Sequence, residues 1–175
     1  MKTKKIKKLG ILGGSFDPPH KGHVKISTEA KKKYKLEKII WAVTKKNPFK
    51  SKSSLSLAKR LALSKKITCN KKFIEVKYLE KVVKSDRTIN LVNYFKERYS
   101  KYEIYFIMGS DNLINFHKWK QWEKISSICK ILIFDRRGYK SQSLKSKSFK
   151  KLGKKVFNFV KFKKVNISSS QLRNI

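Results

Sequence analysis

The sequence predicts an α/β fold: a Rossmann-like doubly wound parallel sheet, in three layers and a single domain. Two observations favour this class. Short apolar runs typical of buried parallel strands alternate with longer segments of helical periodicity. Four polar stretches that follow predicted strands would meet at one edge of such a sheet, where folds of this class bind ligands. The 175 residues suit one domain, 1–175, with a substantial core.

The first predicted strand and helix flank a turn of small residues. A strand is expected over 6–12, buried from Leu9 onward, and a helix over 21–35. Between them lies the sequence GGSFDPPHKGH of residues 13–23. A strand, a glycine turn and a helix start bring backbone N–H groups to one place, which is typical of phosphate sites.

The middle of the chain continues the alternation. Three further strands are expected, over residues 38–44, 73–77 and 103–108. One helix is expected to be capped by Ser54, with apolar positions at Leu57, Ala58, Leu61 and Ala62. A second helix is expected over 88–99. This order indicates parallel strands joined by helical crossovers.

The last third carries two more predicted strands, over 130–134 and 156–162. Between them, residues 139–153 are rich in Ser and Lys and are interpreted as a surface loop. A tryptophan-rich segment, 116–122, follows the strand at 103–108, and the chain closes with the polar stretch 166–173.

The net charge of +35 raises nucleic acid as a partner, and a basic nucleic-acid-binding protein is the remote alternative function. However, 40 of the 46 basic residues are Lys, and they are spread over nearly every segment. Proteins that read nucleic acid rely on Arg for bidentate contacts and concentrate their charge on one element. We therefore interpret the charge as compositional, expect no specific nucleic-acid partner, and expect it to steer anionic small substrates to the protein.

The two cysteines, Cys69 and Cys129, lie far apart in apolar surroundings without metal-ligand spacing. They are interpreted as reduced core thiols, and no metal-ligating residues are assigned. No apolar stretch approaches membrane-spanning length, and the basic start of the chain lacks a signal-peptide pattern. A cytoplasmic protein without a membrane partner is expected.

The glycine turn and its histidines suit phosphate chemistry. Gly13 and Gly14 would let a phosphate approach the backbone, although a tight strand-to-helix connection explains a glycine pair equally well. His20 and His23 lie three residues apart at the helix start, with Asp17 close before them. Imidazoles at such a place can donate hydrogen bonds to phosphoryl oxygens and stabilise charge in a transition state.

Other polar stretches could complete such a site. Ser168 to Ser170, with Arg173 one turn later, would grip a polyphosphate, or would simply cap a terminal helix. Asp111 follows a strand, as acidic residues that bind ribose do. Trp119 would stack on a heterocycle or pack in the core, and Lys50 is a phosphate contact of low specificity.

Residues 13–23 resemble the Gly-[Ser/Thr]-Phe-Asp-Pro-x-His-x-Gly-His motif of the nucleotidyltransferase superfamily. Residues 167–173, ISSSQLR, resemble its second signature, Ile-Ser-[Ser/Thr]-x-x-[Ile/Leu]-Arg. MGSDN at 108–112 and FHKW at 116–119 resemble the bacterial nicotinate-mononucleotide adenylyltransferases. NPFK at 47–50 also fits this family, as does Thr88, although Arg87 stands where the family usually has an aromatic residue.

The resemblance implies adenylyl transfer from ATP to nicotinate mononucleotide, which yields deamido-NAD and pyrophosphate, with Mg²⁺ accompanying ATP. It implies His20 and His23 as catalytic residues and Lys50, Thr88 and Trp119 as mononucleotide contacts. The implied ATP site comprises Gly13, Gly14, Ser15, Phe16, Asp17, His20, His23, Gly109, Asp111, Ser168, Ser169 and Arg173. Nicotinamide mononucleotide or another phosphorylated acceptor is the sibling alternative. The oligomeric state stays open, with a homodimer among the alternatives.

Overall fold

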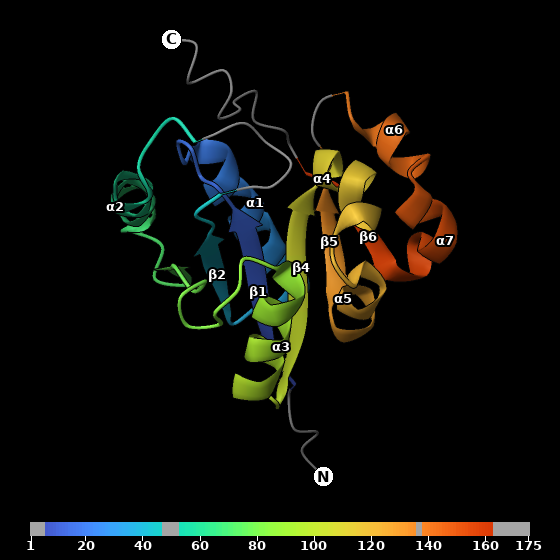
Figure 1. The fold of residues 1–175 in the computed structure, drawn as a ribbon, viewed down its shortest axis with the longest axis horizontal. Helices are drawn as coiled ribbons and strands as arrows, with labels where there is room; N and C mark the ends of the chain where they lie inside the picture. The colour runs from blue at the N-terminus through green and yellow to red at the C-terminus, as the bar shows by residue number, and fades with distance from the viewer. Residues whose placement is uncertain (1–5, 47–52, 136–137, 163–175) are drawn as a thin grey trace.

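The computed structural model describes residues 6–46, 53–135 and 138–162, and it contains one parallel sheet (Figure 1). Six strands form this sheet in the order β3-β2-β1-β4-β5-β6, and all five pairings are parallel. The strands are β1 (Lys7–Gly14), β2 (Lys38–Val43), β3 (Ile74–Lys77), β4 (Tyr102–Gly109), β5 (Lys130–Phe134) and β6 (Phe157–Val160). The predicted fold class is confirmed.

Helices cover both faces of the sheet. One face packs against α1 (Lys21–Tyr34) and α2 (Leu57–Thr68) around the buried strand residues Trp41 and Ile107. The other face, around Ile40 and Phe106, packs against α3 (Thr88–Arg98), α4 (Ser110–Asn115), the 3₁₀ turn η1 (Phe116–Lys118), α5 (Trp122–Ile128) and α7 (Lys147–Val156). A short helix, α6 (Lys140–Leu144), precedes α7. These are the three predicted layers.

From Leu9 onward, the residues of strand β1 are small or apolar on both faces, which suits its position between β2 and β4 inside the sheet. Leu9 and Ile11 are fully buried against one helical layer. Between them, a Cβ added at Gly10 would lie 2.9 Å from Cγ1 of Ile39 and 3.0 Å from Cδ1 of Leu36. Gly10 is therefore required by close packing on the α1 side of the sheet.

Helix α2 differs from its sequence prediction at both its start and its buried face. Its cap is Ser56, whose Oγ accepts the Lys59 N–H at 3.2 Å, so the assignment of the cap to Ser54 is wrong. Its buried positions are polar, at Arg60, Ser64 and Thr68, whereas Ala58 and Ala62 are exposed. The apolar pattern was only half right: Leu57 and Leu61 pack against the core, but Arg60 is buried because its guanidinium donates to loop carbonyls, and Thr68 donates to a carbonyl of its own helix.

The interpretation of residues 139–153 as a loop is also wrong, because the segment forms α6 and most of α7. Ser146 caps α7 by accepting the Phe149 N–H at 3.2 Å, and the buried Ser148 hydroxyl donates to the Leu113 carbonyl at 3.0 Å. Phe149 and Leu152 pack against the core, while lysines occupy the solvent side. A composition of Ser and Lys concealed the few apolar positions that fix this helix.

The two cysteines differ in environment. Cys129 is buried in the core, as predicted, whereas Cys69 is exposed just after α2, so its placement in the core is wrong. Burial raises the pKa of the Cys129 thiol to about 12. Among the residues that the structure describes, no helix is long and apolar enough to cross a membrane.

Candidate active site

The predicted site residues at the carboxyl ends of β1 and β4 lie where the winding of the sheet reverses. Strands β1 and β4 are neighbours, but α1 follows β1 on one face and α4 follows β4 on the other. The carboxyl ends of both strands point to the same edge of the molecule (Figure 1). At this kind of switch point the two connections diverge and leave a crevice beyond the strands, which is where parallel sheets bind ligands.

The two histidines form the start of α1. His20 is the N-cap, and its Nδ1 accepts the Gly22 N–H at 3.1 Å. His23 reciprocates, because its Nδ1 accepts the His20 N–H at 3.2 Å. The ring centroids lie 3.9 Å apart. Since both Nδ1 atoms accept backbone hydrogens, each neutral imidazole carries its own hydrogen on Nε2 and acts there as a donor. The fold thus fixes the tautomer of both rings.

Aromatic packing holds His23 in place. The Phe16 ring stacks on Trp41 with centroids 4.7 Å apart, and it lies 4.9 Å from the His23 ring. Phe16 has a φ of 48°, in the left-handed region that non-glycine residues rarely adopt. Trp41 is fully buried, and its Nε1–H donates to the Ser27 hydroxyl at 2.9 Å. Buried packing around the Phe16 side chain therefore supports a conformation that costs about 1–3 kcal/mol.

The glycines of the turn are not explained by packing inside the protein. A Cβ at Gly13 would lie 3.5 Å from the Phe106 ring, and one at Gly14 would lie 3.5 Å from the Phe16 ring, both ordinary contacts. Neither glycine has a positive φ. Steric packing therefore does not explain these two glycines, and the hypothesis that they let a phosphate approach the backbone stays a prediction beside the simple-turn interpretation.

Asp17 is turned toward the protein. Its carboxylate is almost fully buried and accepts the Ser54 N–H at 2.7 Å and the Leu55 N–H at 2.9 Å. These contacts fasten the loop after β1 to the segment that enters α2. They give Asp17 a structural role in addition to the predicted role in the ATP site, which no observed contact tests.

Arg60, on α2, is a site residue that the sequence analysis missed. Its guanidinium donates to the carbonyls of Ser15 at 2.6 Å, Thr44 at 2.7 Å, Lys45 at 3.0 Å and Leu55 at 3.1 Å. Only 1% of the residue is exposed. In a chain of this charge an arginine is easily read as a surface residue; its rarity among the lysines was the available signal.

Burial lowers the pKa of Arg60, while the nearby carboxylates of Asp17 and Glu80 act in the opposite direction. Glu80, beyond β3, also accepts the Lys45 N–H at 2.9 Å. The buried cation is thus offset by two nearby anions and makes four hydrogen bonds to carbonyls, which are the conditions under which a buried charge is tolerated.

The far side of the crevice begins at the end of β4. Gly109 is the N-cap of α4, and the buried Ser110 hydroxyl donates to the Asp135 carboxylate at 3.4 Å. Asp111 is half-buried in the first turn of α4. The structure therefore brings Gly109, the last residue of β4, and Asp111, in the first turn of α4, to the same edge of the sheet as the histidines.

Trp119 is separated from Gly13 by the ring of Phe106. Its ring meets Phe106 edge-on with centroids 6.0 Å apart, and the same Phe106 ring lies against Gly13. Phe116 contacts it from another side at 5.2 Å, so part of Trp119 packs in the core and part stays exposed. Thr88 is the first residue of α3, after the N-cap Arg87. The predicted residues Lys50, Ser168, Ser169 and Arg173 lie outside the described residues.

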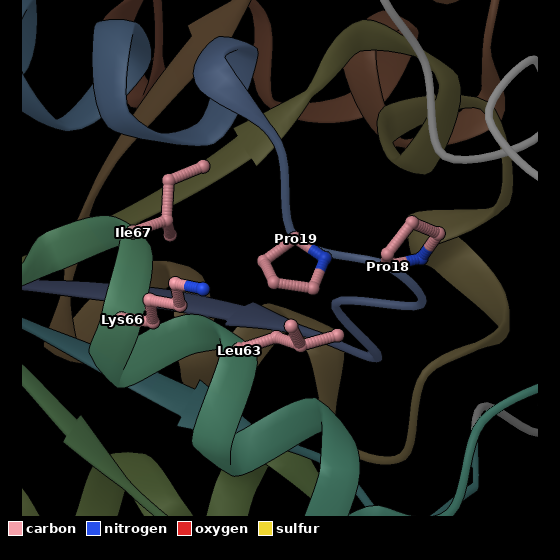
Figure 2. A pocket seen from close by; sticks show the side chains of 5 residues that line it. All are labelled: Pro18, Pro19, Leu63, Lys66 and Ile67. Carbon is pink, nitrogen blue, oxygen red and sulfur yellow. The ribbon is translucent and has the colours of Figure 1, made fainter.

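A pocket of about 440 Å³ lies beside the site, between the loop after β1 and helix α2 (Figure 2). It is lined by Pro18, Pro19, Leu63, Lys66 and Ile67. Its only charged group is Lys66, and it contains none of the predicted site residues. The lining lacks the paired donors and the aromatic face that a nucleotide needs, so we do not assign the substrates to it.

Residues 11–175 match the profile of the family described as cytidylyltransferase-like. A probable nicotinate-nucleotide adenylyltransferase of Pelagibacter ubique is 55% identical over 173 residues, which span 99% of this chain and 96% of that protein. A protein of the same name from a Bradyrhizobium strain is 38% identical over 130 residues, 74% of this chain and 67% of that protein.

A solved structure of similar fold is the Plasmodium falciparum nicotinic acid mononucleotide adenylyltransferase complexed with NaAD. Its TM-score is 0.74 at 24% identity, over 96% of this chain and 83% of that chain. The same Plasmodium enzyme complexed with APC also has a TM-score of 0.74, at 23% identity. At this identity the likeness establishes the common fold.

Proposed function

This chain belongs to the cytidylyltransferase-like family and, within it, to the nicotinate-nucleotide adenylyltransferases, and from that membership we propose that it transfers the adenylyl group of ATP to nicotinate mononucleotide. The products are deamido-NAD and pyrophosphate, in NAD biosynthesis. The phosphate of the mononucleotide attacks the α-phosphorus of ATP, one P–O bond forms, and the bond to the leaving pyrophosphate breaks. No covalent enzyme intermediate is required, so catalysis consists of positioning and charge stabilisation.

The observation that carries this proposal is the paired capping of His20 and His23 at the start of α1. Two neutral rings with fixed Nδ1 acceptors present Nε2–H donors at a helix N-terminus, which is where a phosphate is favoured. In the proposed mechanism these donors stabilise the negative charge that builds on the transferred phosphoryl group. Asp111 contacts ribose, and Trp119 offers its exposed part to the pyridine ring.

We propose Mg²⁺ as a companion of ATP, held mainly by the substrate phosphates. Among the described residues no three His, Cys, Asp or Glu side chains gather closely enough to hold a metal ion. Mg²⁺ is commonly bound through substrate phosphates and water, with only one or two protein carboxylates. When bound, it neutralises charge on the polyphosphate. The chain's own histidines and backbone N–H groups then orient the phosphates. We propose that the reaction takes place in the cytoplasm, where ATP is supplied.

A pyrophosphate-release assay tests the proposal. ATP with nicotinate mononucleotide should give turnover, and nicotinamide mononucleotide and phosphopantetheine should give much lower kcat/KM when assayed in parallel. If nicotinate mononucleotide supports no turnover while either of the others does, the assigned acceptor is wrong. His20→Ala, prepared alongside, shows whether the measured turnover belongs to this site.

A further inference from the structure

Arg60 connects three segments that are distant in sequence. Its acceptors are one carbonyl in the loop after β1, two in the loop after β2 and one in the segment that enters α2. The two shortest bonds, to Ser15 and Thr44, join the carboxyl ends of two adjacent strands. A planar guanidinium can hold several carbonyls in a fixed relation, whereas a lysine ammonium acts as a single point.

The hydrogen bond from Arg60 to the Ser15 carbonyl is linked to the histidines through Phe16. The Ser15 carbonyl belongs to the peptide that enters Phe16, the residue with the left-handed backbone. The Phe16 ring in turn packs against both Trp41 and His23, and those two rings also meet edge-on with centroids 5.9 Å apart. Rotation of the Ser15 peptide would therefore displace the ring that supports His23, and His20 would follow because the two histidines cap one another.

Asp17 fastens the same loop from the opposite direction. Arg60 binds carbonyls, and Asp17 binds the N–H groups of Ser54 and Leu55. The entry to α2 is thus attached to the loop after β1 through one cation and one anion, both at most 3% exposed. We call this pair, Arg60 and Asp17, the loop clamp.

Fold stability alone does not call for a buried guanidinium here. Replacing a buried charge network with apolar side chains of similar volume is often neutral for stability. What an apolar residue cannot do is hold the four carbonyls at fixed positions. The chain instead places its cation at the one sheet edge where loop conformation decides where the histidines lie.

We propose that Arg60 is a positioning residue for adenylyl transfer, which holds the loop after β1 in the conformation that places His20 and His23 against the reacting phosphates. The inference rests on the proposed function for its reaction, but the geometry it concerns exists without substrate. A displacement of about 1 Å at a reacting group can cost about 100-fold in rate, and we expect a loss of this order.

The test compares Arg60→Lys and Arg60→Met with the exposed control Arg98→Lys, each at a temperature where circular dichroism shows it folded. Steady-state kinetics separate kcat from KM for ATP and the mononucleotide. Long-range ¹H–¹⁵N spectra report the tautomers of His20 and His23 without substrate. We expect both Arg60 variants to lose about 100-fold in kcat and to change the histidine spectra, with the control unchanged.

A wild-type kcat and wild-type histidine spectra in Arg60→Lys would overturn the proposal, as would a lower melting temperature with unaltered kcat in Arg60→Met. The spectra keep the two proposals separable. If the wild-type protein fails to use nicotinate mononucleotide but Arg60→Lys still perturbs both histidines, the proposed acceptor is wrong and the clamp stands. If the wild type turns over and the variants match it, the clamp is wrong and the function stands.

Discussion

The amino ends and the carboxyl ends of the parallel strands, called here the amino edge and the carboxyl edge of the sheet, are stabilised by different interactions. At the amino edge, Glu103 accepts the Tyr105 hydroxyl at 2.7 Å and pairs with Lys8 at 3.8 Å and with Lys130. These charged groups are partly exposed side chains that bind one another. At the carboxyl edge, Arg60 and Asp17 are buried and bind backbone atoms of loops.

This difference distinguishes interactions that stabilise the fold from interactions that fix the geometry of the site. Partly exposed ion pairs tolerate small displacements and are each worth about 0–1 kcal/mol. Buried charges bonded to backbone groups tolerate little displacement, because any acceptor that is lost leaves a desolvated charge. The amino edge can therefore vary without consequence for chemistry, while the carboxyl edge fixes loops whose positions decide the reaction.

The largest expected effect at the carboxyl edge comes from the histidines. His20→Ala and His23→Ala should each lower kcat by about 100- to 10,000-fold, because a donor to the transition-state charge is removed. His20→Asn is a control for the loss of helix capping in His20→Ala, because an asparagine side chain can still accept a backbone N–H at the N-cap. Circular dichroism should show a native fold in all three. Wild-type kcat in both alanine variants would remove the histidines from the mechanism.

Alanine substitutions at two glycines of β1 should have intermediate effects, one on the stability of the fold and the other on ATP binding at the site. Gly10→Ala should destabilise by about 1–3 kcal/mol, because its Cβ would overlap Ile39, but should leave kcat unchanged. Gly14→Ala should leave the melting temperature almost unchanged and raise the KM for ATP about tenfold by obstructing phosphate approach. Denaturant unfolding and initial rates measure the two. An unchanged KM in Gly14→Ala would favour the simple-turn interpretation.

The smallest effect is expected at the amino edge. Glu103→Gln should cost less than about 1 kcal/mol, because its partners are partly exposed, and should not change kcat. Urea unfolding at neutral pH gives the first quantity and the pyrophosphate assay the second. A fall in kcat of tenfold or more would contradict the division between the two edges.

The same variant has a predictable pH dependence. Burial acts to raise the pKa of Glu103, but hydrogen bonds from Lys130 and Tyr105 outweigh it, and the pKa in the folded protein is lowered. Its stabilisation is therefore present above the unfolded pKa of about 4.3 and is lost as the pH falls through the lower folded value. The difference in melting temperature between wild type and Glu103→Gln should therefore shrink steadily as the pH falls below about 4.3. A difference that does not shrink on acidification would show that the charge of the Glu103 carboxylate does not provide the stabilisation.

Much of the fold was predictable because its signals are local. The strand at 130–134 coincides with β5, and the other predicted strands lie within two residues of the observed ones at each end. Helix α1 and its two histidines were also predicted. Apolar periodicity and the glycine turn report on neighbouring residues, so they can be read without knowing what packs against them.

The errors occurred where a residue's partner lies far away in the chain. Serine is a common N-cap residue, yet the N–H of Ser54 is bound by Asp17, 37 residues away, and Ser56 caps the helix instead. Residues 139–153 are surface-like in composition, but Phe149 and Leu152 fix them on the core as helix. Local propensity is a weak guide wherever a distant contact decides the conformation.

The sequence alone determined the alternating α/β order, the turn at 13–23 and the histidines three residues apart. These depend on the chemistry of adjacent residues. The structure showed that capping bonds within residues 20–23 fix both imidazoles as Nε2–H donors. Only the tertiary structure decided that a buried Arg60 binds the loops after β1 and β2. The role of Arg60 depends on which distant backbone carbonyls meet its guanidinium in space, and the linear order of residues does not encode this in any short pattern.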